Sequence, residues 1–464
     1  MVNKTDQKNL FFSVRIILLI IAFGTISLHI VKLSTNHWVI GSDGLGYYAH
    51  IRSLIIDHDL DYENEFRDFN PFGHSVQNFR QRTRTGYVAN KYPIGPALLW
   101  APFFIAAHVL TIGINHLGFN LQTNGYSFLY QLFTGAGTTF YGVLGLYFIF
   151  KIVNRYFSSK ISASAIGAIF LSTNLIHYFI CEPSMAHILS MFSVSLFLYL
   201  CLKDFDKKTT SSFLFCGLTA GLMTMMRYQN ALFAIVPLIE LSIGCFRRGF
   251  SWKKFSGSMK MGIVLLAAAG FAFLPQLLVL KVIFGLNTAT TSTATTFAGS
   301  GDYMLNSFNY FTPKLLSVLF SPHHGLIYWT PIIFICLIGM ILFSQKKTLQ
   351  GTILLSCFIL QWYINAAWHD WTFGNAFGAR AFINCTAIFT LGLATVFDRY
   401  AVNKKTITLM LIFIITANLS FMSQFLLKII PQSEPVTWST VIAGNFDLIT
   451  MLKSKVSHLL KRIN

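Results

Sequence analysis

Charged residues are scarce in this sequence. Asp, Glu, Lys and Arg make up 11% of its 464 residues, whereas hydrophobic residues make up 54% and aromatic residues 16%. A soluble globular domain usually carries about a quarter charged residues. No stretch of the chain has the composition of a soluble domain.

Paired cysteines are missing as well. The seven cysteines lie mostly inside apolar runs and form no CxxC pair. This pattern is typical of small core residues, and it excludes a disulfide framework and a cysteine metal site.

The formal net charge of +18 does not indicate a nucleic-acid partner. The basic residues form short clusters between apolar runs instead of covering one soluble face. Such clusters are typical of membrane topology, because basic residues stay on the cytoplasmic side.

Long apolar runs are what the sequence has in abundance. Runs of roughly 16 to 25 residues recur from Ser13 to Lys428, which predicts an all-α polytopic membrane protein. The first run, 13–31, is too long for a cleavable signal core, so we expect it to remain as a signal anchor. We predict eleven spans, near residues 13–31, 126–150, 161–180, 185–202, 211–226, 230–245, 261–284, 326–344, 350–366, 381–397 and 406–428.

One apolar run, 93–114, does not fit an alternating topology. If it crossed the membrane, the basic cluster at Lys151 would lie outside. Pro93, Pro96 and Pro102 are expected to break its helical hydrogen bonding near the start. We therefore predict a juxtamembrane or re-entrant helix on the outer face.

The predicted orientation puts most chemically interesting residues on the outer side of a single membrane domain, 1–464. The outer segments include a large first loop, 32–93, a second long loop, 286–325, and the C-terminal tail, 430–464.

Asp43 opens the first outer loop, in the stretch "SDGLGYYAHIRSL". The apolar residues that follow have the spacing of an amphipathic helix lying on the membrane. Asp43 is therefore either the N-cap of this helix or a catalytic carboxylate. Tyr47 and Tyr48 in the same stretch are candidates for substrate contact. We interpret the later acids of the loop, from Asp57 to Asp68, as solvated loop residues.

Three basic residues are candidates for binding a phosphate. Lys91 lies at headgroup depth, where it is either an interfacial anchor or a phosphate ligand. Arg227 lies between two short spans and needs an anionic partner there. Arg380 follows Gly374 and Gly378, and its planar guanidinium matches phosphate oxygens.

Other outer residues are candidates for substrate binding, and each has a structural explanation too. Glu182 and His187 lie at an outer hairpin, where His187 serves packing as readily as chemistry. Trp368 belongs to an aromatic group that an interfacial belt also explains. His324 and Asp370, with nearby His323 and His369, lack the spacing of a known metal motif.

The ordered set of these motifs resembles a known family. "SDGLGYYAHIRSL", "KYPIGPALLWAPFF", "EPSMAHILSMF", "MMRYQNALFAIVPL", "SPHHGLIYWTPI" and "WHDWTFGNAFGARAF" resemble the polyprenyl-phosphate-sugar-dependent glycosyltransferases of the GT-C superfamily. The nearest likeness is to the bacterial envelope branch grouped with protein mannosyltransferases and the lipid A aminoarabinose transferase. It extends over nearly the whole chain.

The resemblance implies a multispan enzyme that uses a lipid-phosphate-linked sugar at the outer membrane surface. Asp43 would be the catalytic base, and Lys91 and Arg380 would contact the donor phosphate. Protein mannosyltransferases carry an Asp-Glu pair where this chain has a single acid, and they have a large luminal domain that it lacks, so the acceptor stays open. A divalent metal also stays open, because only parts of the superfamily use one.

This chemistry predicts transfer to an acceptor hydroxyl by single displacement with inversion, since a retaining route needs a second well-placed carboxylate. The expected location is a bacterial inner membrane, with the site facing the periplasm. The alternative is a multispan transporter or lipid-linked-sugar flippase. Transporters commonly have internal repeats and ionisable residues near the midplane, and we find neither.

Overall fold

The computed structural model describes residues 4–35, 37–69, 82–203, 209–246, 251–285, 307–400 and 404–463, and the regular elements of these ranges are helices. The ranges contain no β-strand, and Arg82 and Val88 form an isolated bridge. The first part of the predicted outer loop 286–325 lies outside them.

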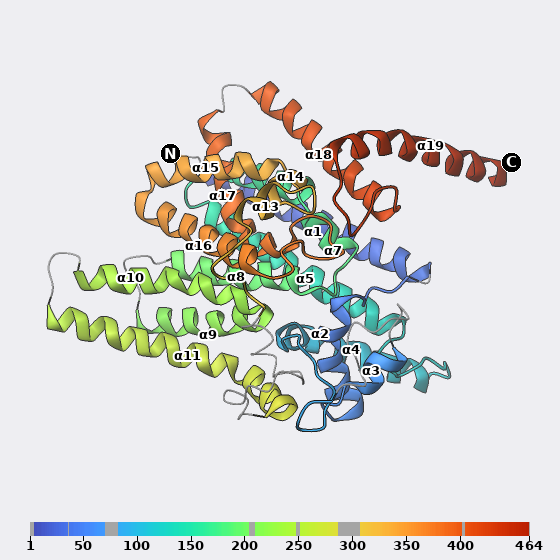
Figure 1. The fold of residues 1–464 in the computed structure, drawn as a ribbon, viewed down its shortest axis with the longest axis horizontal. Coiled ribbons are helices and arrows are strands. Elements are labelled where there is room, and N and C mark those ends of the chain that lie inside the picture. Colours follow the sequence, from blue (N-terminus) through green and yellow to red (C-terminus); the bar gives the residue numbers. More distant parts are fainter. Residues whose placement is uncertain are drawn as a thin grey trace. The chain divides into compact units, whose positions relative to one another are not determined.

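The chain divides into two compact units, and Figure 1 labels most of their helices. The first comprises residues 1–159 and 178–308, and the second comprises residues 160–177 and 309–464. The first unit holds α1 (Lys4–Ser34), α2 (Asp43–Arg52), the π-helical turn η1 (Ser53–Asp57), α3 (Glu63–Asp68), α4 (Gly95–His116), α5 (Phe128–Val153), α8 (Ala186–Lys203), α9 (Thr210–Met226), the 3₁₀ helix η2 (Tyr228–Ala234), α10 (Ile235–Phe246) and α11 (Trp252–Phe284).

The second unit contains the remaining helices. It holds nearly all of α6 (Ser159–Ser172), the start of α7 (Leu175–Ile180), α13 (Leu315–Phe320), α14 (Leu326–Trp329), α15 (Ile332–Lys346), α16 (Thr348–Ala367), the 3₁₀ helix η3 (Arg380–Cys385), α17 (Thr386–Arg399), α18 (Lys404–Leu426) and α19 (Trp438–Ile463).

Seven helical segments within the described ranges are long and apolar enough to cross a membrane. They are Val14–Ser34, Gly95–His116, Phe128–Val153, Ala186–Lys203, Trp252–Phe284, Arg380–Arg399 and Lys405–Leu426. Four shorter apolar helices accompany them. The chain is thus a polytopic helical membrane protein, while the count of eleven crossings stays a prediction.

Two of the predicted spans are interrupted. The run 161–180 divides into α6 and α7 around Asn174, and the run 326–344 divides into α14 and α15 before Ile332. Pro331 explains the second break, because proline has no backbone N–H to donate to the preceding turn.

The prolines of the run 93–114 do not break its helix, contrary to expectation. Helix α4 is continuous over 22 residues, with a proline in its first turn and Pro102 inside it. A proline in the first turn is tolerated, because the N–H that it lacks would have no helical partner there. Helix α4 is therefore long enough to span, and its predicted non-crossing placement stays a prediction.

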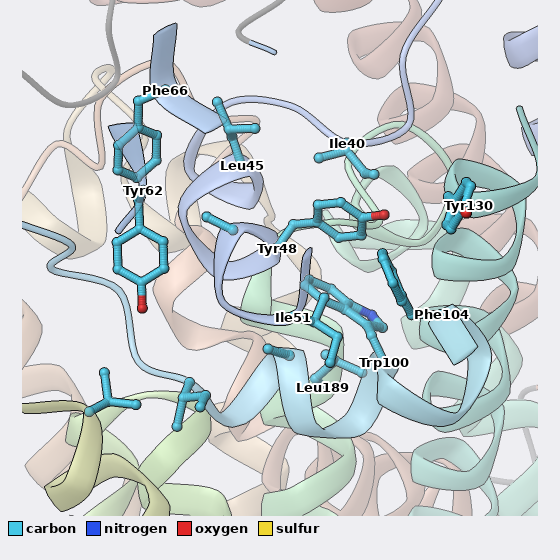
Figure 2. Packing of buried hydrophobic residues seen from close by; sticks show 14 of the residues in the cluster. Ile40, Leu45, Tyr48, Ile51, Tyr62, Phe66, Trp100, Phe104, Tyr130 and Leu189 are labelled. Atoms are coloured by element: carbon cyan, nitrogen blue, oxygen red, sulfur yellow. The ribbon is translucent and has the colours of Figure 1, made fainter. Parts of the chain in front are cut away.

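Helix α2 forms where predicted, but it is not an amphipathic surface helix, because eight of its ten residues are buried against protein. Leu45 and Tyr48 are fully buried and Ile51 is nearly so. Figure 2 shows Tyr48 near Trp100 and Phe104 of α4, and its ring lies 5.7 Å from that of Phe104. Full burial of a large apolar side chain contributes roughly 1.5 to 3 kcal/mol. This packing fixes α2 on α4 instead of on lipid.

Candidate functional site

Asp43 is the first residue of α2 and is not its N-cap. Ser42 occupies the N-cap position with a positive φ of 53° and makes no side-chain capping bond. The N-cap interpretation of Asp43 is therefore wrong. The half-buried carboxylate instead accepts a hydrogen bond at Oδ1 from Tyr92 Oη, at 2.7 Å.

Tyr92 brings three of the predicted site residues together. Its ring lies 4.8 Å from the ring of Tyr47, and the exposed Lys91 ammonium lies 5.4 Å from its ring centroid. Asp43, Tyr47 and Lys91 thus surround a residue that sequence reasoning missed. Nothing in the spacing between Asp43 and Tyr92 marks this pair, and the one available signal was that Tyr92 adjoins Lys91.

A buried network fixes the backbone of Tyr92. His50 Nε2 lies 2.8 Å from Tyr92 O, and His50 Nδ1 lies 2.7 Å from Tyr62 Oη. Asn90 donates to Gly46 O at 2.8 Å and accepts from Tyr92 N at 3.1 Å. Burial lowers the pKa of His50 to about 4, so the imidazole is neutral at pH 7. A neutral ring can donate to Tyr92 O through one nitrogen and accept from Tyr62 through the other.

The two glycines of "DGLGYY" allow close approach on two sides of α2. A Cβ at Gly46 would overlap the ring of Tyr92, and a Cβ at Gly44 would overlap Ser184. Ser184 Oγ also accepts a hydrogen bond from Gly41 N at 3.2 Å. These contacts require glycine, because any side chain would push α2 away from both neighbours.

The segment that carries Ser184 is tied to the membrane helices. Trp100 Nε1 of α4 donates to Thr138 Oγ1 of α5 at 2.9 Å, and Thr138 Oγ1 donates to Pro183 O at 2.8 Å. The half-buried Glu182 precedes Pro183. Glu182 is thereby held on a segment that touches α2.

His187 and Arg227 form a pair in the first unit. Arg227 Nη1 donates to His187 Nδ1 at 2.9 Å, and the His187 ring packs edge-on against Tyr178. A Cβ at Gly95 would overlap Met225 O, so the end of α9 touches the start of α4. The segments that carry Arg227 and Lys91 are therefore neighbours.

Tyr48, predicted as a candidate for substrate contact, lies in the core. Its side chain is fully buried, its hydroxyl donates to Gly125 O, and burial raises its pKa. This position favours a packing role.

One acid of the first outer loop is not a solvated loop residue. Glu65 is fully buried, and its Oε1 lies 3.0 Å from Arg52 Nη1, which also pairs with Asp57. Burial raises the pKa of Glu65 to about 8, against the opposing effect of Arg52. The solvated interpretation is wrong for Glu65, whereas the exposed Asp68 pairs with Arg67 and fits it.

The second unit holds the other predicted residues. His324 is buried with φ 61°, its Nδ1 donates to Thr372 O at 2.7 Å, and burial lowers its pKa to about 4. Arg380 and Asp370 are both near enough to affect His324 electrostatically. Asp370 also accepts a hydrogen bond from Thr372 Oγ1 at 2.7 Å. The motifs "SPHHGL" and "WHDWTFGNAFGAR" therefore meet at His324.

Glycine conformation shapes the same motif. Gly374 and Gly378 have φ of 60° and 68°, a region that residues with a side chain seldom adopt. Half-buried Trp368, whose ring lies 4.6 Å from that of His369, precedes this turn, and half-buried Arg380 follows it at the start of η3. The two groups of predicted residues lie in different units, so each is described by itself.

The described residues contain no group of three or more His, Cys, Asp or Glu side chains arranged to hold a metal ion. They therefore indicate no ligand set for a divalent cation.

Comparison with known proteins agrees with the motifs. Residues 137–278 match the family model described as dolichyl-phosphate-mannose-protein mannosyltransferase. No curated protein matches the chain significantly. The apo crystal structure of an oligosaccharyltransferase from Archaeoglobus fulgidus is similar at 15% identity and a TM-score of 0.44. That alignment covers 94% of this chain and 56% of the other, so the chain spans just over half the length of that enzyme.

The fold is that of a multispan helical membrane protein. The family model matches less than a third of this chain, and the matched part is similar to dolichyl-phosphate-mannose-protein mannosyltransferases. The matched segment includes Glu182, His187 and Arg227 but not Asp43 or Arg380.

Proposed function

We propose that this protein transfers a sugar from a polyprenyl-phosphate-linked donor to an acceptor hydroxyl, with Asp43 as general base. The observation that carries the proposal is the position of Asp43, whose carboxylate is held by Tyr92 beside the exposed Lys91 ammonium. A proton acceptor and a cation on neighbouring segments are what this reaction requires.

The reaction is a single displacement. The acceptor oxygen attacks the anomeric carbon on the face opposite the phosphate, and its proton passes to the Asp43 carboxylate. The bond between the anomeric carbon and the phosphate oxygen breaks, and the lipid phosphate leaves with the bonding electrons. This sequence inverts the anomeric configuration. Lys91 stabilises the negative charge on the leaving phosphate.

Arg227 and Arg380 are the further proposed phosphate contacts. A guanidinium can donate two parallel hydrogen bonds to phosphate oxygens, which a single ammonium cannot do. Tyr47, Glu182, His187, His324, Trp368 and Asp370 are the proposed contacts to the sugar and the acceptor. The proposed location is the outer, periplasmic face of a bacterial inner membrane, where the product is an envelope glycan, lipid or glycosylated protein.

Replacement of Asp43 by asparagine tests the proposal. Asparagine keeps an oxygen that can accept from Tyr92, yet it cannot take a proton, so folding and donor binding should stay near normal. Turnover should fall by about 10² to 10⁴-fold, the usual contribution of general base catalysis. The assay follows sugar transfer from a synthetic prenyl-phosphate donor by purified protein without an ion gradient.

The matched control is Asp68→Asn, which removes an exposed loop carboxylate and should leave turnover unchanged. Near-normal transfer by Asp43→Asn would move the catalytic role elsewhere. Movement of intact donor without glycoside formation would instead support the transporter alternative.

A further inference from the structure

The C-terminal helix α19 has three distinct faces. One face packs on α18, where Val441 and Leu448 are buried. Gln424 of α18 donates to Val441 O at 3.1 Å and to Asn445 Oδ1 at 3.0 Å. A Cβ at Gly444 would overlap Gln424, so the two helices are in close contact.

A second face of α19 is apolar and exposed. Trp438, Ile442, Phe446 and Ile449 have exposed fractions of 42%, 59%, 70% and 50%. Their spacing of four, four and three residues places them in one stripe along the helix. The third face is polar and exposed, and it includes Thr440, Asp447 and Ser454.

The charge of α19 is concentrated toward its C-terminal end. Asp447 is the one acidic residue in the helix sequence, whereas four basic residues follow it: Lys453, Lys455, Lys461 and Arg462. A helix with this many charges in its last turns is not suited to crossing a bilayer, because each charge is costly at its centre.

Helix α18 packs against the first turns of α19. Helix α18 is a candidate span, and only 11% of its apolar window is buried by protein, as expected of a helix that faces lipid. The hydrogen bonds from Gln424 to α19 lie near the C-terminal end of α18. Helix α19 therefore contacts α18 at the end of its candidate span, and Figure 1 shows α19 as the dark red helix ending at the C-terminus.

We propose that α19 lies in the membrane interface and binds an anionic lipid surface. The stripe from Trp438 to Ile449 enters the boundary between headgroups and acyl chains, and the basic end of the helix contacts anionic headgroups. Exposed apolar residues along one face and several lysines in the same helix sequence are the features of an interfacial helix. This role is independent of the proposed sugar transfer.

The test places a bimane fluorophore on the apolar or the polar face of the full-length protein. Phe446→Cys carries it on the apolar stripe, and Thr440→Cys carries it on the polar face as the matched control. Labelled protein without an added cysteine gives the background from native thiols. In nanodiscs of anionic lipid with brominated acyl chains, quenching should be stronger at position 446 than at position 440, and aqueous iodide should show the reverse order.

The charge contribution is tested by replacing Lys453, Lys455, Lys461 and Arg462 with glutamine in the Phe446→Cys protein. Each basic residue near an anionic surface favours the bound state by about fivefold. Quenching by brominated lipid should therefore rise from zwitterionic to anionic nanodiscs in the parent protein and lose most of that rise in the glutamine variant.

Two results would overturn the proposal. Iodide quenching at position 446 as strong as at position 440 in anionic nanodiscs would mean that the stripe faces water. Protection of position 446 that follows protein concentration, but not lipid charge, would mean that a second copy covers it.

Discussion

Replacing Tyr92 with phenylalanine removes one hydroxyl and leaves the ring in place. The ring contacts with Tyr47 and Lys91 remain, so the fold should be preserved. The lost bond to Asp43 Oδ1, at 2.7 Å, is a hydrogen bond to a carboxylate. Such bonds contribute about 1.5 to 3 kcal/mol, and the half-buried setting of Asp43 favours the lower value.

Without this hydrogen bond the Asp43 side chain can adopt other rotamers, and this lowers kcat. If its three staggered χ1 rotamers became equally populated, the productive fraction would fall to about a third. If the bond instead contributes its lower value of about 1.5 kcal/mol in the transition state, its loss lowers the rate by roughly tenfold. Tyr92→Phe should therefore lower kcat by about three- to tenfold and leave the KM for the donor nearly unchanged.

The assay is sugar transfer by purified protein at varied donor concentration. Tyr87→Phe is the control, because it removes a hydroxyl from a half-buried tyrosine of the same segment and should leave kcat unchanged. An unchanged kcat in Tyr92→Phe would refute the positioning role. A lowered melting temperature in that variant would show that the hydroxyl serves folding instead.

Three further substitutions test other parts of the site. Gly46→Ala should lower turnover at least as much as Tyr92→Phe, because the added methyl group overlaps the Tyr92 ring. Gly113→Ala is the control, because its methyl group enters open space and should leave turnover unchanged. Equal activity of the two alanine variants would contradict the packing argument. The pKa of Glu65 is raised to about 8 from 4.5, so its contribution to stability is present below pH 4.5 and lost as pH rises to about 8. Between about pH 4.5 and 8, the free energy of unfolding of the wild-type protein should fall with pH more steeply than that of Glu65→Gln, by at most about 1.4 kcal/mol per pH unit. An equal pH dependence of the two proteins in thermal unfolding would exclude this titration. Arg380→Lys keeps the charge but loses the paired hydrogen bonds, so turnover should fall by about ten- to a hundredfold at normal expression; unchanged turnover and donor affinity would leave it an interfacial anchor.

Helices that consist of one continuous apolar run could be predicted from the sequence. The runs that became α1, α5, α8, α11 and α18 are continuous and apolar, and such composition predicts a helix without knowledge of its neighbours. The tail was predicted only as an outer segment, and the sequence analysis missed α19, because its alternating polar and apolar residues do not form a run.

The site was predictable in part. Asp43 and Lys91 stood out because each follows or precedes an apolar run, but Tyr92 is one of 18 tyrosines and joins Asp43 only through the folding of the first loop. Glu65 was grouped with solvated acids because its burial depends on the tertiary position of Arg52. Long-range pairing of this kind leaves no trace in the spacing of a single sequence.

The hydroxyl of Thr138 couples segments that lie far apart in the sequence. It accepts from Trp100 and donates to Pro183, so one atom of α5 sets the distance between α4 and the segment that touches α2. A change to valine would keep the volume and release both contacts. A substitution within α5 would therefore move two segments of the candidate site while leaving every proposed ligand-binding residue intact, and directed evolution would reach this position only if its libraries include the helices outside the outer loops.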